Sequence, residues 1–226
     1  TFPEYFIAKN RIDLTASTDV DAILEKVKEQ YAAYLANPEG YFDSVELMEL
    51  DTLVGGKGIN NPDLVKVLAE NSGPAIDYLE TLGMTIHNVG AFGGASVKRI
   101  HRPVDENGKV IAVGSYMIPV LEENLKKRDK ITLLTSVTAE EITKSEDGKI
   151  SGVKAKGSSG NSVEVKAPVV IVDTGGFAAN KEMVEKYQPS LKGYMSTNAS
   201  GALGQGITMA AAIGADNVDM DQIQIH

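Results

Sequence analysis

The amino-acid sequence predicts an α/β fold that combines part of a parallel sheet, an antiparallel β-meander and a helical N-terminal part. Four consecutive β-branched residues, Val169 to Val172, indicate a strand buried on both faces, as in parallel sheets. From Thr135 to Lys166 apolar and polar residues alternate between turn signals, which is typical of an antiparallel meander with one polar face. Before Gly83 the apolar residues recur mostly at helical spacing, so this part is predicted to be helical.

The composition argues against several classes of protein. The 226 residues, 42% of them hydrophobic, suffice for one substantial domain or two small ones, and the net charge of −9 disfavours nucleic acid or an anionic membrane as main partner. Cysteine is absent, which excludes disulfides and cysteine-based metal sites. No apolar run approaches the ~20 residues of a membrane helix and no signal peptide opens the chain, so we expect a soluble protein, cytoplasmic or associated with the cell surface. The start at Thr1 and the end at His226 suggest a fragment of a longer protein.

The predicted helices of the first part begin at polar capping residues and end at glycine or proline. The first helix is expected to begin at a capping box at Thr18 and to end at Asn37, and the second to run from Ser44 to Leu53. A third is expected to begin at Asn61-Pro62, and a fourth to run from Ser72-Gly-Pro74 to Gly83.

The middle of the chain predicts a hairpin, a helix and a second short parallel strand. Asn107-Gly108 lies between two apolar segments, which is a hairpin signal. A helix then carries Met117, Leu121 and Leu125 on one face. It can accommodate Pro119 only in its first turn, because proline lacks the backbone N–H that an interior position donates. Ile131 to Leu134 is predicted to be the second strand.

Two glycine segments are candidate ligand loops. Gly175-Gly176 follows the buried strand, and ligands of open α/β sheets lie beyond the carboxyl ends of the strands. Gly201-Ala-Leu-Gly-Gln-Gly206 opens a predicted helix, where unpaired N–H groups favour negative or electron-rich groups. Each segment could instead be a plain turn. Neither is a Gly-x-Gly-x-x-Gly fingerprint, which is found after no predicted strand of this chain.

Catalytic side chains are hard to single out. The histidines at 87, 101 and 226 lack metal-ligand spacing, and a lone histidine is usually a hydrogen-bonded structural residue. His226 is the best candidate of the three, since the alternating residues from Val218 place Gln224 on its face. No serine stands in a nucleophile-elbow sequence, and the carboxylates are interpreted as ordinary surface charge.

A set of short motifs runs in order from about Val45 to the end of the chain: Asp51-Thr-Leu-Val-Gly-Gly56, Gly93-Gly-Ala-Ser96, His101-Arg-Pro103, Thr174-Gly-Gly-Phe177, Pro189-Ser-Leu-Lys-Gly193, Ser196-Thr-Asn198, Gly201-Ala-Leu-Gly-Gln-Gly206 and Ile223-Gln-Ile-His226. Taken together and in this order, they resemble the flavoprotein subunit of fumarate reductase and succinate dehydrogenase, in particular the soluble flavocytochrome c type. No single motif is specific, but the ordered set is.

The resemblance implies FAD as cofactor and assigns positions to it. Val137 to Ala139 match a segment that faces the adenine side of FAD, and Thr174-Gly175-Gly176 match a second cofactor-facing turn. Gly204 and Gln205 match a segment near the flavin, although the family usually has Asp where this chain has Gln205. His226 matches a histidine that bonds a carboxylate of the dicarboxylate substrate, and Gln224 lies beside it.

The resemblance also implies the domain organisation. Residues 1–43 are a helical N-terminal segment that matches the family poorly, 44–218 are a partial FAD-binding domain, and 219–226 begin the link to a capping domain that is absent here. The family's N-terminal strand with its Gly-x-Gly-x-x-Gly turn is also absent, and so is the arginine that protonates the substrate.

The function that the resemblance implies is reduction of the carbon–carbon double bond of an unsaturated carboxylate, with fumarate as the default. Reduced flavin N5 delivers hydride to one carbon and the arginine protonates the other, so we expect the chain alone to be inactive. Two alternatives stay open. The chain could be a cofactor-free structural or binding module whose exposed sheet edges a dimer or swapped partner covers, or a fragment of a urocanate-type reductase.

Overall fold

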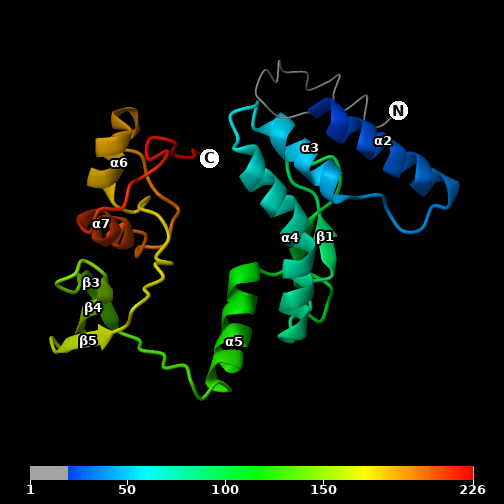
Figure 1. Ribbon diagram of the computed structural model, residues 1–226. Coiled ribbons are helices and arrows are strands. Elements are labelled where there is room, and N and C mark those ends of the chain that lie inside the picture. The colour runs from blue at the N-terminus through cyan, green and yellow to red at the C-terminus, as the bar shows by residue number, and fades with distance from the viewer. Residues whose placement is uncertain (1–19, 226) are drawn as a thin grey trace. The chain divides into compact units, whose positions relative to one another are not determined.

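The computed structural model describes residues 20–225 and divides the chain into two compact units, Thr1–Ile131 and Thr132–His226 (Figure 1). The capping residue expected at Thr18 and the candidate ligand His226 lie outside the described residues.

The described part of the first unit begins with three helices, α2 (Val20–Ala36), α3 (Val45–Gly55) and α4 (Pro62–Thr81). Helix α3 contacts both of the others, and Figure 1 shows its ribbon between those of α2 and α4. Its N-cap is Ser44, whose hydroxyl accepts a hydrogen bond from Leu47 N at 3.1 Å. Leu47, Leu50 and Val54 of α3 join Val27 of α2 in a buried cluster, and fully burying one such side chain contributes about 1.5–3 kcal/mol.

Helix α4 runs without a break through Pro74, so the expectation of two separate helices here was wrong. Asn61 caps it and Pro62 is its first residue, as predicted. Polar side chains next to the proline bond the helix backbone: Asn71 donates to Val67 O at 2.8 Å and Ser72 to Leu68 O at 2.6 Å.

After Gly83 the first unit continues with a short antiparallel pair, β1 (Asn88–Gly90) and β2 (Ile100–Arg102), and then helix α5 (Val113–Lys126). Of the predicted hairpin, a single antiparallel bridge forms between Val104 and Val110. Pro119 lies inside α5 and not in its first turn, which corrects the prediction. Tyr116 of α5 accepts a hydrogen bond from Thr85 N at 2.7 Å, and Asn124 donates to Leu82 O at 2.8 Å.

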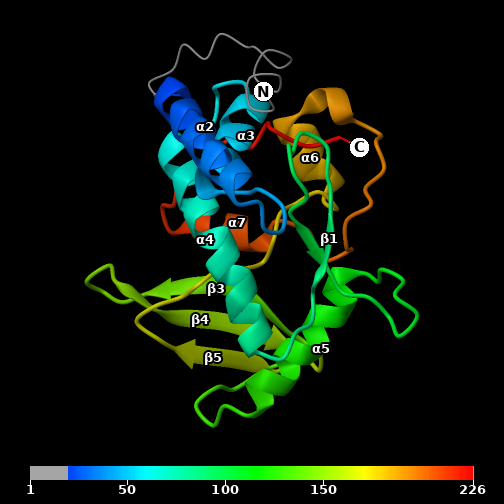
Figure 2. The same cartoon turned by 90° about the vertical axis from the view of Figure 1, so that its right-hand side faces the viewer.

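The second unit contains a three-stranded antiparallel sheet in the order β3 (Val137–Lys144), β4 (Ile150–Gly157) and β5 (Ser162–Lys166), seen as three adjacent arrows in Figure 2. Helix α7 (Gln205–Ala212) contacts β3, with Met209 and Ile142 buried. Helix α6 (Lys181–Tyr187) and the short 3₁₀ helix η1 (Pro189–Leu191) complete the unit.

The predicted parallel strands are not formed among the described residues. Val169–Val172 and Ile131–Leu134 run without strand hydrogen bonds, and Ile171 is 80% exposed. A parallel strand needs a neighbour on at least one edge, and no described segment pairs with either one. The alternation from Val218 onward likewise forms no strand in the described part.

Candidate functional site

The two glycine segments singled out from the sequence meet in the second unit. Gly204 N donates to Gly176 O at 3.1 Å, and Ala179 N donates to Ala202 O at 3.0 Å. Asn180 secures the junction, because its side-chain amide donates to Leu203 O at 3.0 Å while its carbonyl oxygen caps α6. The loop after Val172 and the start of α7 therefore form one connected structure.

The packing at this junction requires glycine at two positions. A Cβ on Gly206 would stand 2.1 Å from Thr174 Oγ1 and 2.6 Å from Val172 Cγ1. Gly204 has a φ of +74°, and a Cβ there would lie 2.6 Å from Met183 Sδ. Glycine 204 thus provides both the left-handed backbone conformation and the space against α6. Thr174 consequently lies against the first turn of α7.

The other predicted cofactor and substrate residues fall around two cavities of the second unit. Ala139 and Gln205 line one of about 760 Å³. Gly176 and Gln224 line another of about 530 Å³. Val137 is half-buried at the start of β3, opposite Gly157. The structure thus brings Thr174, Gly176 and Gly204 together but places Ala139 and Gln224 at different cavities, and His226 lies beyond the described residues.

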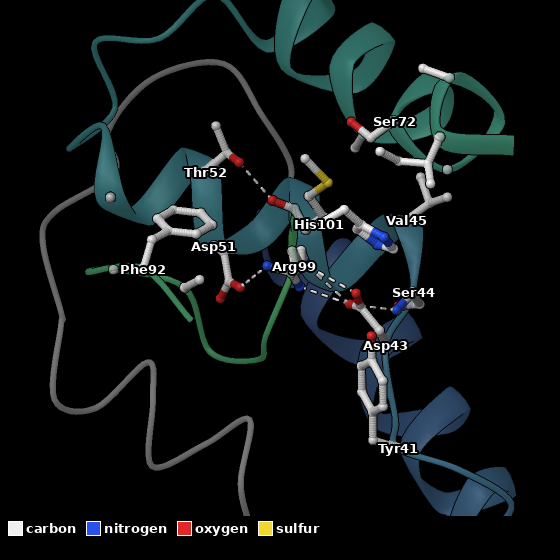
Figure 3. Close-up of a pocket in the computed structure, with 18 of the residues that line it drawn as sticks. Tyr41, Asp43, Ser44, Val45, Asp51, Thr52, Ser72, Phe92, Arg99 and His101 are labelled. Atoms are coloured by element: carbon white, nitrogen blue, oxygen red, sulfur yellow. Dashed lines mark hydrogen bonds and ion pairs between the residues drawn. The ribbon is translucent and has the colours of Figure 1, made fainter. Parts of the chain in front are cut away.

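The first unit contains a larger cavity, of about 950 Å³, which the sequence did not predict (Figure 3). Residues from α3, from α4 and from the segment between Phe92 and His101 line it. Figure 3 shows Arg99 between Asp43 and Asp51, with Phe92 and His101 on the cavity wall.

An ion-pair network at this cavity joins the start and middle of α3 to the segment from Ser96 to Arg99, about 50 residues further along the chain. Arg99 Nη1 donates to Asp51 Oδ2 at 2.5 Å, and Arg99 Nη2 donates to Asp43 Oδ1 at 2.8 Å. Ser96 donates to the same Asp51 oxygen through its backbone N at 3.0 Å and its hydroxyl at 2.7 Å. Burial opposes the positive charge of Arg99, but the hydrogen bonds to Asp43 and Asp51 outweigh it and raise the pKa of Arg99. Asp51 therefore fixes the end of the Gly93-Gly94 loop onto α3.

This network corrects the interpretation of the carboxylates as ordinary surface charge. Asp51 is 6% exposed and is held by a cation and a serine, whereas its sequence neighbourhood shows only an amphipathic helix. In the sequence, the one signal for this network was that Asp51 and Ser96 each belong to a motif of the same family. That signal does not reveal that the two residues are in contact. Among the described residues no group of His, Cys, Asp and Glu could hold a metal ion.

Comparison with known proteins identifies the family. The model of the FAD binding domain matches residues 31–226, so the chain belongs to this family, whose cofactor is FAD. The match begins upstream of the Val45 at which the quoted motifs start. None of the described helices combines the length and apolar character that crossing a bilayer requires.

Several characterised relatives are reductases. A fumarate reductase (cytochrome) of Shewanella frigidimarina is 44% identical over 184 residues, which cover 81% of this chain and 31% of the relative. An NADH:fumarate oxidoreductase of Klebsiella pneumoniae is 42% identical over 188 residues, or 83% of this chain and 20% of that protein. A urocanate reductase of Eggerthella lenta is 33% identical over 198 residues, or 83% of this chain and 31% of that protein.

The fold leads to the same family. The open conformation of a flavocytochrome c3 fumarate reductase matches with a TM-score of 0.74 and 33% identity, over 87% of this chain and 33% of that one. The chain thus spans a third or less of the length of these relatives.

Proposed function

We propose that this chain is part of the FAD-binding domain of a longer flavoprotein that reduces the carbon–carbon double bond of an unsaturated carboxylate, with fumarate as the default substrate. The observation that carries the proposal is the hydrogen bond from Gly204 N to Gly176 O. It joins two segments that the family resemblance assigns separately to the cofactor. The identity to fumarate reductases and the chain's small share of their length support the same conclusion.

The residues at the junction fit a dinucleotide. A Cβ on Gly175 or Gly176 would meet nothing within 4 Å, so a ligand can approach the backbone there. Helix α7 has Gly204 as its N-cap residue and no side-chain cap, which leaves first-turn N–H groups for an electron-rich ligand. We assign Thr174, Gly175 and Gly176 to a cofactor-facing turn, and Gly204 and Gln205 to the flavin side of FAD. Val137 and Ala139 take the adenine side.

Gln205 and the C-terminal segment supply the polar groups proposed to lie near the flavin and the substrate. Gln205 stands where the family usually has Asp and can both donate and accept a hydrogen bond without charge. FAD, when bound, supplies the hydride for the double bond. Gln224 and His226 hold one carboxylate of the substrate and stabilise the negative charge that builds up on it. The general acid is an arginine of the longer protein, and 219–226 begin the link to its capping domain.

The exposed apolar segments take part in the same assembly. We infer that Val169–Val172 and Ile131–Leu134 become parallel strands once neighbouring strands of the longer protein pair with them. Their exposed side chains, such as Ile171 and Leu133, then enter the core. A dimer or swapped copy could pair the same edges, but no relative supports that arrangement.

The experiment compares the longer protein with the isolated chain. The purified longer protein should keep a flavin absorbance band near about 450 nm after desalting and should oxidise a reduced dye when fumarate is added. The Gly206→Ala variant should lose flavin, because Thr174 is displaced, whereas Gly201→Ala, whose Cβ meets nothing within 4 Å, should retain it. A colourless longer protein, or fumarate-dependent turnover by the isolated chain, contradicts the proposal.

Urocanate is the second candidate substrate, because the urocanate reductase is 33% identical over 198 residues. Comparing turnover of fumarate with turnover of urocanate in the longer protein distinguishes them. A cofactor-free module would instead be colourless in both forms.

A further inference from the structure

Helix α7 lies along strand β3, and three residues of the strand meet it in turn. Ala139 borders a cavity together with the first turn of the helix. Ile142 is buried, as is Met209 in the middle of the helix. Lys144 Nζ then donates a hydrogen bond to Ile213 O, at the C-terminal end of α7, at 2.6 Å. The helix and the strand therefore run side by side in the same direction, and Figure 1 shows α7 next to β3.

A β-bulge places these three residues on one face of β3. The register with β4 shifts between Ala139 and Glu141, which leaves Glu140 without a partner. Side chains alternate between the two faces of a strand, and one extra residue restarts that alternation. Odd-numbered residues thus face α7 before the bulge and even-numbered ones after it, which agrees with the burial of Ile142. The second register shift adds its extra residue to β4, so Lys144 stays on the face of Ile142.

The end of α7 leaves a carbonyl oxygen for Lys144. Gly214, with a φ of +100°, turns the chain out of the helix, and Ala215 N donates back to Ala210 O at 3.1 Å. This glycine turn bonds carbonyls of the last helical turn, but no backbone N–H of the described residues bonds Ile213 O. The ammonium group of Lys144 supplies that bond, and the helix dipole favours a cation at this end. Within the described part of the chain Lys144 forms no ion pair, so this bond is its one polar contact there.

The way in which α7 lies on β3 matters for the cofactor. The start of β3 and the start of α7 are the two segments assigned above to the adenine side and the flavin side of FAD, so their separation depends on the placement of the helix. The apolar contact in the middle of α7 is not directional and does not by itself fix that placement. A hydrogen bond at the far end of the helix does, because it restricts both the distance and the angle of its two groups.

We propose that Lys144 is a positioning residue of the FAD site. It fixes the end of α7 on β3 and thereby holds the start of the helix at the separation from the start of the strand that the cofactor requires. Lys144 lines neither of the two cavities described in the second unit, so it acts through α7 and not by touching the cofactor. This inference rests on the proposed function, because that function assigns FAD to the two segments.

The test compares binding of FAD and of ADP to the longer protein after its flavin has been removed. FAD reaches both segments, whereas ADP is the adenine end alone. Lys144→Met keeps a long side chain but removes the ammonium group. It should weaken FAD binding by about two- to fivefold, the effect of a cation at a helix C-terminus, because binding must then order a loosened helix. ADP should bind as tightly as it does to the wild type. The change in flavin fluorescence measures FAD binding, and competition with FAD measures ADP binding.

Further variants separate positioning from the loss of a charge or of the fold. Lys144→Arg retains a cation with N–H donors and should bind FAD as the wild type does. Lys166→Met removes the same charge from the end of β5 in the same sheet and should leave both affinities unchanged. If Lys144→Met does not fold, Lys144→Gln, which keeps a neutral donor, should give a loss in the same direction. Far-ultraviolet circular dichroism shows which variants are folded.

Three results would overturn the proposal. They are an unchanged FAD affinity in Lys144→Met, an equal loss of FAD and ADP binding, which indicates a general loosening of the fold, and a loss in Lys144→Arg as large as in Lys144→Met. Each of these leaves the proposed reductase function untouched, because the wild-type longer protein still binds FAD. A wild-type longer protein that is colourless contradicts the proposed function instead, and this inference with it, so the two failures are distinguishable.

Discussion

The cavity of the first unit is lined by side chains that bond one another, whereas the glycine segments of the second unit are joined mainly through their backbones. Arg99, Asp51 and Ser96 complete each other's hydrogen bonds over a buried network. At the junction in the second unit, the key hydrogen bond joins Gly204 N to Gly176 O. The two glycine segments can approach each other closely because glycine has no side chain. Charge therefore determines the first site and shape determines the second, so different substitutions should damage each.

The largest effect is expected from Arg99→Met. The variant leaves Asp51 buried without its cation, and breaking a buried ion pair in this way costs about 3–5 kcal/mol. Lys154→Met breaks the exposed pair with Glu141 in the second unit and should cost about 0–1 kcal/mol. Urea unfolding of both variants, followed by far-ultraviolet circular dichroism, measures the difference. Equal small losses would show that the network contributes little to stability.

In the second unit the corresponding test adds one methyl group. Alanine at a helical glycine usually stabilises by about 0.5–1 kcal/mol, and Gly114→Ala in α5 should show that gain. Gly206→Ala should instead lose about 1–3 kcal/mol, because its Cβ meets Thr174 Oγ1 at 2.1 Å and β-branched side chains cannot easily rotate away. The same urea titration reports both signs, and a gain at residue 206 would contradict the tight junction.

A smaller difference is expected between two helix caps. Ser44→Ala removes the cap of α3 and should cost about 1 kcal/mol. Asn180→Ala removes the cap of α6 and also the hydrogen bond to Leu203 O, so its cost should be larger by about 1 kcal/mol. If thermal and urea unfolding give equal losses for the two variants, the bond to Leu203 adds nothing to the junction.

Local signals predicted much of the fold. Asn61-Pro62 located the start of α4, and Ser44 located the start of α3, because these caps are satisfied by bonds within a few residues. The continuous helix through Pro74 was missed, because proline signals a helix end in the sequence, whereas the packing of α4 against α3 is not visible there. The strand at Val169–Val172 depends on a neighbouring strand, and no local pattern can tell whether that neighbour is present.

The candidate sites divide in the same way. The segments of Gly176 and Gly204 were each singled out only as candidate ligand loops, and the hydrogen bond that joins them was not predicted. The network of Asp43, Asp51 and Arg99 was not recognisable, because its members are separated by up to 56 residues and each alone resembles a surface charge. The assignment of FAD contacts to single residues stays a prediction.

The smallest expected effect is the contribution of two glutamates on α3 to the pH dependence of stability. This contribution has opposite signs for Glu46 and Glu49. Glu46 is partly buried, which raises its pKa, but hydrogen bonds from Lys26 and Gln30 outweigh burial and lower the pKa. A lowered pKa in the folded state means that the stabilisation is present above the ordinary carboxyl pKa of about 4.3 and is lost as the pH falls below it. Burial raises the pKa of Glu49, so ionised Glu49 opposes folding once the pH rises past its raised pKa.

Matched amide variants separate these two contributions. Glu46→Gln should lower the free energy of unfolding at neutral pH and should have little effect well below pH 4, where the wild-type carboxyl is protonated. Glu49→Gln should raise the free energy of unfolding slightly at neutral pH. Urea unfolding at both pH values measures each change, and with both residues on one helix the comparison is free of differences in helix context. If both variants are less stable than the wild type at neutral pH, burial does not control the pKa of Glu49. The contacts of α3 with α2 would then differ from those in the structure.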